Sequence, residues 1–94
     1  MTTPLIAQLV NRSGSIASGG TAQDIYAANA APRFYLLVQN VSDEDLWVDF
    51  DRDAAANTGI LIKAGTAWEP LTLFTGRLSI FGATTGKYFV CKTA

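Results

Sequence analysis

The strongest pattern in the chain is a pair of apolar runs on either side of a short acidic segment. Arg33–Val41 carries apolar side chains at both odd and even positions, which indicates a central strand covered on both faces. Leu46–Phe50 alternates cleanly and places Trp47 and Asp49 on the face opposite its other three residues. The connector, Ser42–Asp45, is rich in side chains that bond the backbone of a turn. This stretch therefore predicts two strands joined as a hairpin through a tight acidic turn.

Shorter extended segments recur along the rest of the chain, each bounded by Gly, Pro, Asn, Asp or Ser. We expect strands at residues 5–10, 59–63, 66–73, 77–83 and 87–92, while residues 24–28 fit either a strand or one helical turn. Seven or eight short strands at roughly 8–12-residue spacing predict an all-β fold. The architecture expected is an antiparallel β-sandwich or partly closed barrel, and we favour a jelly roll. Spacing does not reveal the strand order.

The N-terminal part of the chain differs from the rest in composition. Ser13–Gln23 consists almost entirely of Ser, Gly, Ala and Thr, with Ile16 as its one large apolar residue. Such a segment has little to bury and tolerates unusual backbone conformations. We therefore expect one domain over residues 1–94, in which residues 1–23 form either a loop or a partly extended arm ordered by a neighbour.

The proportion of apolar residues is high for so small a domain. Hydrophobic residues make up 49% of the 94 residues and charged residues only 16%, against a usual charged fraction of about 25%. A domain of this size buries only roughly 60–65% of the surface that its unfolded chain exposes. Some apolar area should therefore lie on the surface, where it normally marks a partner site. This predicts a homo-oligomer or assembly component; the alternative is a monomer with an Ala-rich apolar surface.

The distribution of charge indicates neither a nucleic-acid partner nor a membrane partner. The net charge is −1, and the seven basic residues are scattered from Arg12 to Lys92, so neither a nucleic-acid footprint nor a polybasic membrane patch is present. The first ten residues resemble neither a signal peptide nor a membrane span. Cys91 is the one cysteine, which leaves no intrachain disulfide. We expect a soluble protein made in a reducing cytoplasm.

The residue inventory offers little for catalysis. The chain has no histidine, which excludes Ser-His-Asp and Cys-His arrangements within one subunit. Cys91 lies on a predicted strand and is interpreted as a buried structural thiol, although Lys92 would lower its pKa if the thiol were exposed. We predict no catalytic residue and no cofactor.

One acidic motif has the spacing that begins a calcium loop. Asp49, Asp51 and Asp53 form a D-x-D-x-D pattern, but the positions of the required Gly and Glu hold Ala54 and Ile60. We interpret the segment as a solvated loop and predict no metal site.

Aromatic residues are the best candidates for contacts with other molecules. Tryptophan and tyrosine at a surface are typical anchors of protein interfaces, and the same side chains can stack on sugar rings. Core filling accounts for most of the aromatic residues. The predicted interface positions are Tyr35, Trp47, Trp68 and Phe74.

Several motifs over residues 29–92 resemble a family of small virion proteins of tailed bacteriophages. They are Arg33-x-x-Leu36-Leu37-Val38-Gln39-Asn40-x-Ser42, Leu46-Trp47-Val48-Asp49-Phe50, Gly59-Ile60-x-Ile62, Ala64-Gly65, Trp68-Glu69-Pro70, Thr75-Gly76, Ser79-Ile80 and Ala83-Thr84-Thr85-Gly86-Lys87-x-Phe89. The pattern consists mainly of hydrophobic spacing and turn residues. Where members of the family commonly carry Asn-Phe-Gly, this chain has Asp49-Phe50-Asp51, which alters the turn that follows.

The resemblance implies a structural role in a virion. Members of this family are β-sandwich modules that serve as capsid decoration (cement) proteins or as parts of tails and fibres. A decoration protein would contact the major capsid protein or other virion proteins and copies of itself, with many modest contacts adding up. The alternatives are a tail, fibre or head-to-tail subunit of the same fold, and a carbohydrate-binding module that uses Trp47 or Trp68.

Overall fold

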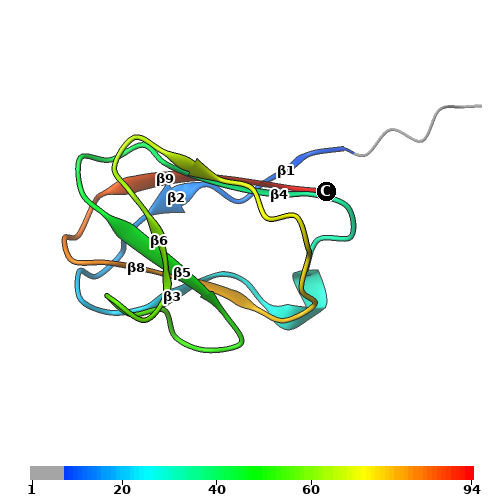
Figure 1. The fold of residues 1–94 in the computed structure, drawn as a ribbon, viewed down its shortest axis with the longest axis horizontal. Coiled ribbons are helices and arrows are strands. Elements are labelled where there is room, and N and C mark those ends of the chain that lie inside the picture. The colour runs from blue at the N-terminus through cyan, green and yellow to red at the C-terminus, as the bar shows by residue number, and fades with distance from the viewer. Residues whose placement is uncertain (1–7) are drawn as a thin grey trace, which may run out of the picture.

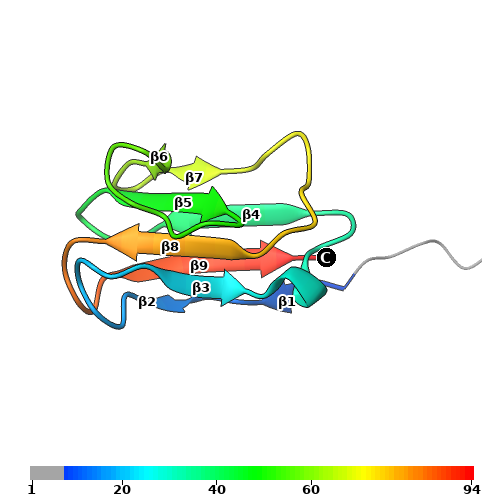
Figure 2. The ribbon, with the colours of Figure 1, turned by 90° about the horizontal axis from the view of Figure 1, so that it is seen from below.

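The computed structural model describes residues 8–94 and confirms the all-β class. Two antiparallel sheets face each other (Figures 1 and 2). In residues 8–94 the helical structure is a single 3₁₀ turn, η1 (Ala28–Ala30), and no helix is long and apolar enough to cross a membrane. The strands are β1 (Val10–Asn11), β2 (Gly14–Ser15), β3 (Gln23–Tyr26), β4 (Leu36–Asn40), β5 (Leu46–Phe50), β6 (Ile60–Ile62), β7 (Ala67–Trp68), β8 (Leu78–Gly82) and β9 (Tyr88–Thr93).

The strands pair in a nested order. The first sheet runs β1-β9-β4-β7, with β2 also on β9, and the second runs β3-β8-β5-β6. Consequently β2 pairs with β9, β3 with β8, β4 with β7 and β5 with β6, all antiparallel. The chain thus resembles one long hairpin, closed at the β5–β6 connection and folded over into two layers. Contacts between distant parts of the sequence hold both sheets together.

The core lies between the two sheets and follows the alternation of the strands. In β4 and β5 the inward positions up to Val48, such as Leu36, are fully buried, whereas the outward positions Leu37 and Trp47 are half-buried. Burying one apolar face of each sheet against the other is the main source of stability in such a sandwich. The buried cluster consists of Ile16, Tyr26, Leu36, Val38, Leu46, Val48, Ile62, Leu78, Ile80, Phe89 and Cys91.

The predicted hairpin between the two strongest strands is wrong. β4 is a central strand, as expected, but its neighbours are β9 and β7, and β5 pairs with β6 and β8 in the other sheet. The connector 41–45 therefore crosses from one sheet to the other. Two strands that follow each other in the sequence, each with one apolar face, can lie side by side in one sheet or face each other across a sandwich. The apolar faces are buried in both arrangements. Periodicity does not distinguish the two arrangements.

Asn40 stabilises this crossing. Its side-chain amide donates hydrogen bonds to the carbonyl oxygens of Glu44 (2.6 Å) and Ile62 (2.8 Å). Its side-chain oxygen accepts the backbone N–H (2.9 Å) and the hydroxyl (2.7 Å) of Ser42. Asn40 is fully buried, so one residue at the end of β4 connects the first sheet to the connector and to β6 in the second sheet.

The Gly- and Ser-rich N-terminal stretch is bound to the chain's own sheets over its described part. β1 and β2 both pair with β9, and Ile16 is buried in the core. The backbone of residues 16–20 also bonds the β8–β9 connection and the end of β8: the Gly86 N–H donates to the Ile16 carbonyl and the Gly20 N–H to the Gly82 carbonyl, both at 2.8 Å. At Gly19 a side chain would overlap the backbone carbonyl of Ala83, so the composition here permits close approach of two backbones.

Other expectations differ from the structure in smaller ways. Of the strand expected at residues 5–10, residues 5–7 lie outside the described residues and only the last joins β1. The ambiguous segment 24–28 is a strand up to Tyr26, and η1 follows. The segment expected to be extended up to Leu73 has strand geometry only at β7, an edge strand that ends two residues before Pro70. Proline cannot donate to a sheet ladder, which is consistent with this early end.

Candidate interaction surfaces

The two ends of the sandwich differ in character. Five of the nine large apolar side chains exposed in residues 8–94 belong to segments that meet at the end where β9 finishes (Figures 1 and 2). We call this set the apolar end: Leu9, Val10, Phe34, Leu71 and Phe74. The opposite end, which we call the polar end, carries the connectors 41–45 and 83–87, which are joined by an ion pair between Lys87 and Asp43 at 2.7 Å; its exposed large apolar residues are Val41 and Tyr88. Exposed apolar side chains gathered at one end of a small domain are candidates for a contact surface.

Phe34 is held at the apolar end by unusual backbone bonding. The carbonyl oxygen of Ala94 accepts the backbone N–H groups of Arg33, Phe34 and Tyr35 at 3.0, 2.7 and 3.0 Å. Three consecutive N–H groups converging on one oxygen form a concave nest. This fixes the backbone of residues 33–35 while 61% of the Phe34 side chain remains exposed. The side chain is thus presented to solvent by a well-anchored backbone.

Two of the predicted interface residues meet through a third aromatic residue. Phe50, at the end of β5, packs against Trp68 with 5.9 Å between ring centroids and against Phe74 with 4.8 Å. The tilted geometry is a favourable one for aromatic pairs. Trp68 is half-buried against the core, whereas Phe74 is 52% exposed. The cluster joins the two sheets and leaves Phe74 as its exposed member.

Tyr35 lies beside this cluster and is hydrogen-bonded to the residue that follows Trp68. Its hydroxyl donates a hydrogen bond to the carboxylate of Glu69 at 2.5 Å. This hydrogen bond is the main reason that the pKa of Tyr35 is raised. Tyr35, Trp68 and Phe74 therefore occupy one region of the molecule, although their role as an interface stays a prediction.

Trp47 does not join them. It lies on the outer face of the second sheet, directly opposite Leu61 on β6 and Phe81 on β8. Its ring and that of Phe81 are 6.1 Å apart in an edge-to-face arrangement. Leu61 is 42% exposed, and the other two are half-buried. These residues form what we call the outer-face row: Leu61, Trp47 and Phe81.

Sequence reasoning identified only Phe74 of the apolar end and missed Leu9, Val10, Phe34 and Leu71. Phe34 falls in phase with the buried Leu36, so alternation assigns it to the core, but it lies before the first residue of β4. Leu71 is fully exposed in the connection between β7 and β8. Its place next to Pro70, which disfavours a central strand, is the one sequence signal that could have indicated this.

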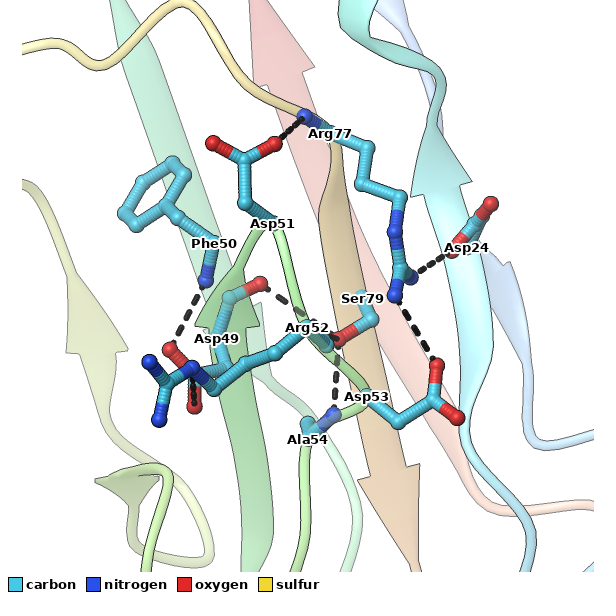
Figure 3. Close-up of polar contacts among 9 residues, drawn as sticks. All are labelled: Asp24, Asp49, Phe50, Asp51, Arg52, Asp53, Ala54, Arg77 and Ser79. Atoms are coloured by element: carbon cyan, nitrogen blue, oxygen red, sulfur yellow. Dashed lines mark hydrogen bonds and ion pairs between the residues drawn. The ribbon is translucent and has the colours of Figure 1, made fainter.

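A polar network covers the β3–β8–β5 side of the same end (Figure 3). The Arg77 guanidinium contacts the carboxylates of Asp24 (2.6 Å) and Asp53 (3.0 Å). These two hydrogen bonds, that to Asp24 first, raise the pKa of Arg77. Its backbone N–H donates to the Asp51 carboxylate at 3.1 Å. Arg77 thus contacts three aspartates from two segments of the chain, β3 and the loop after β5.

Each of the three aspartates of the calcium-like motif has a partner within the protein. Asp49 accepts the backbone N–H of Phe50 and faces Arg52, whereas Asp51 and Asp53 contact Arg77 (Figure 3). Within residues 8–94 no group of three or more acidic or cysteine residues could hold a metal ion. The contacts shown are those of a loop tied to its neighbours.

Ser79, on β8, bonds the backbone of the same loop. Its buried hydroxyl accepts the backbone N–H of Ala54 at 2.8 Å and lies 2.6 Å from the carbonyl oxygen of Arg52, to which it donates (Figure 3). A hydroxyl can satisfy a donor and an acceptor of the loop at once. This explains why a polar residue occupies a fully buried position of β8.

The buried titratable groups are unsuited to neutral-pH chemistry. Cys91 is fully buried, as predicted, and burial raises the pKa of its thiol to about 11 despite the opposing effects of Arg12 and Lys92. Burial also raises the pKa of Tyr26 to about 12. Arg12 lies over the Tyr26 ring, 5.6 Å from its centroid. Neither the thiol nor the phenol ionises near neutral pH.

Comparisons with known proteins identify no relative. No protein-family model, no curated protein and no solved structure matches the chain. The resemblance to virion proteins of tailed phages therefore stays a prediction.

Proposed function

We propose that this chain is a structural subunit of a bacteriophage virion, most specifically a capsid decoration protein that stabilises contacts between coat subunits. The observation that carries the proposal is that one small domain presents two separate apolar surfaces, the apolar end and the outer-face row. A subunit that holds neighbours together needs contact surfaces on at least two sides. Repetition over a shell would then let modest contacts add up.

The strand order supports the same proposal at the level of architecture. We infer that the nested pairing of β2 with β9, β3 with β8, β4 with β7 and β5 with β6 is a jelly roll. Jelly rolls occur in viral capsid domains and in lectins. This likeness of fold is an analogy, and the two apolar surfaces carry the functional argument.

The decisive measurement is the number of copies of the chain in purified particles, determined by quantitative mass spectrometry against the coat protein. A decoration protein is expected in a fixed, high ratio to the coat protein. A much lower number, equal for every particle, would assign the chain to the tail, a fibre or the head-to-tail connection. Absence from purified particles would overturn the virion role.

A variant pair tests which surface contacts the particle. Leu61→Ser removes the exposed apolar member of the outer-face row and is expected to weaken binding of the purified chain to particles that lack it. Tyr88→Ser is the matched control, because Tyr88 is 66% exposed at the polar end and belongs to neither surface. Equal binding by both variants would exclude the outer-face row.

A carbohydrate-binding module is the second candidate, favoured by the outward position of Trp47 on an open sheet face. Binding of a sugar beside this ring should shift the tryptophan fluorescence of the chain. A fluorescence spectrum that does not respond to a panel of glycans would eliminate this candidate.

A further inference from the structure

The first part of the described chain, residues 8–18, lies along the outer edge of β9 and forms what we call the strap. It contains β1 and β2, and both pair with β9 alone. On its other side β9 pairs with β4. The strap is therefore the edge of the first sheet, and within residues 8–94 no strand lies beyond it (Figure 2).

The strap contributes little to the core. Within residues 8–18, Ile16 is the one buried residue. All the other members of the buried cluster belong to β3, β4, β5, β6, β8 or β9. Because the burial of apolar side chains is the main source of stability, releasing the strap costs the burial of one large side chain. Unfolding the rest of the sandwich costs the burial of all the others.

One of the hydrogen bonds between the strap and β9 depends on a side chain. The Arg12 N–H donates to the Cys91 carbonyl at 2.8 Å. The Ile16 N–H donates to the Lys87 carbonyl at 2.9 Å. In the other direction, the Cys91 N–H donates to the side-chain hydroxyl of Ser13 at 3.0 Å. A single hydroxyl thus takes the place of a backbone acceptor in the middle of this edge.

The strap is joined to the segment before β3 through Gly19 and Gly20. Both glycines are bonded to the far side of the sandwich: the Gly20 N–H donates to the Gly82 carbonyl and the Gly19 N–H to the Thr85 hydroxyl, each at 2.8 Å. Gly20 has a φ of 80°, and two successive glycines permit large changes of backbone dihedral at low cost. The strap can therefore move away from β9 while the chain from Gly19 onward stays in place.

We propose that the strap detaches from β9 as a unit while the rest of the sandwich stays folded. Local openings of this kind occur in the parts of a fold that have few buried apolar contacts. Detachment converts β9 from an inner strand into an edge strand and leaves the N–H and carbonyl groups of Cys91 unpaired. Open edges are the elements to which extended segments of other chains add. The strap is thus a removable cover over a sheet edge, and this inference does not depend on the virion role.

Native-state hydrogen exchange of the full chain tests the proposal, followed by NMR at urea concentrations below the unfolding transition. Successive residues of a strand direct their N–H groups to opposite neighbours, so that of Val90 faces β4 whereas that of Cys91 faces the strap. After correction for intrinsic rates, the Cys91 N–H should exchange about a hundredfold faster than the Val90 N–H, with little dependence on urea. The N–H groups of Arg12 and Ile16 should show the same opening free energy as that of Cys91. Equal protection of Cys91 and Val90, or unequal openings within the strap, would overturn the proposal.

A pair of serine variants separates local opening from global unfolding. Ser13→Ala removes the hydroxyl acceptor of the strap and should make the Ile16 N–H exchange about fivefold faster, with the Val90 N–H unchanged. Ser42→Ala is the matched control, because it removes hydrogen bonds of the connector 41–45 instead. It should accelerate exchange at Val90 and leave Ile16 unchanged. No effect of Ser13→Ala on Ile16, or equal acceleration of both N–H groups by Ser42→Ala, would show that the strap opens only when the whole domain unfolds.

Discussion

Asp51 and Arg77 are joined by two hydrogen bonds just beyond the ends of β5 and β8, one between their backbones and one from the Arg77 backbone to the Asp51 side chain. The backbone N–H of Asp51 donates to the Arg77 carbonyl at 2.9 Å, and the Asp51 carboxylate accepts the backbone N–H of Arg77 at 3.1 Å. The carboxylate thus replaces the carbonyl that would continue the β5–β8 ladder. Asp51 has a φ of 58°, in the left-handed region that favours glycine. Asp51 is also the position at which the virion family predicted from the sequence commonly has Gly.

Substitutions of Asp51 should separate its backbone effect from its hydrogen bond. Asp51→Ala loses the acceptor and keeps the strained φ, so the free energy of unfolding should fall by about 1–2 kcal/mol. Asp51→Gly loses the acceptor but relieves the strain and should be about 1 kcal/mol more stable than Asp51→Ala. Asp51→Asn retains an oxygen and tolerates this φ, so it should remain close to the unchanged chain. Urea denaturation measures all three, and equal stability of the Ala and Gly variants would contradict this account.

Gly76 and Asp51 are expected to be coupled. A side chain at Gly76 would overlap the Asp51 carboxylate, which the Arg77 N–H holds in place. Gly76→Ala should therefore destabilise the fold by about 1–3 kcal/mol. In the Asp51→Gly background the same substitution should cost about 1 kcal/mol less. A double-mutant cycle by urea denaturation gives the coupling, and strictly additive effects would show that the overlap is unimportant.

Asn40 should be one of the most sensitive polar residues of the fold. Asn40→Ala removes four side-chain hydrogen bonds and leaves the buried carbonyl of Ile62 without its donor from this side chain. We expect a loss of about 3 kcal/mol in the free energy of unfolding. The matched control is Gln39→Ala, on the outer face of the same strand, with an expected change within about 0.5 kcal/mol. Similar losses for both variants would contradict the assigned role.

Stability should fall at alkaline pH because two buried groups resist ionisation. Cys91 has a folded-state pKa of about 11 against an ordinary 9.0, and Tyr26 about 12 against 10.0. A raised pKa means that the folded state binds the proton more tightly. The stability gained is complete below the unfolded pKa and is lost as pH rises towards the folded value. The decline should begin near pH 9 through the thiol and steepen above pH 10 through the phenol.

Cys91→Ala separates the two contributions. This variant lacks the thiol, so its free energy of unfolding should stay flatter between pH 9 and pH 10 than that of the unchanged chain. Denaturant titrations at a series of pH values measure the slopes. The same slope in both proteins over this interval would show that the thiol contributes nothing to the pH dependence.

The local alternation of the chain was sufficient to predict its fold class. The alternation of Leu46–Phe50 and the apolar run of Arg33–Val41, with turn residues between the segments, indicated strands. The structure has such strands at β4 and β5. The burial of Cys91 was likewise predictable from its place in an alternating segment. These properties depend on neighbours in sequence, which is why the sequence alone reveals them.

Which strands pair with each other was decided by the tertiary structure. β4 and β5 carry faces that fit equally well in one sheet or across two, and contacts of β4 with β9 and of β5 with β8 select the second arrangement. The same long-range contacts place Phe34 and Phe74 at one end, separate Trp47 from them, and bring the Ile62 carbonyl to the Asn40 side chain. Alternation specifies which side of a strand is buried. The surface that covers that side, and the side chains that gather at an end, depend on residues far apart in the chain.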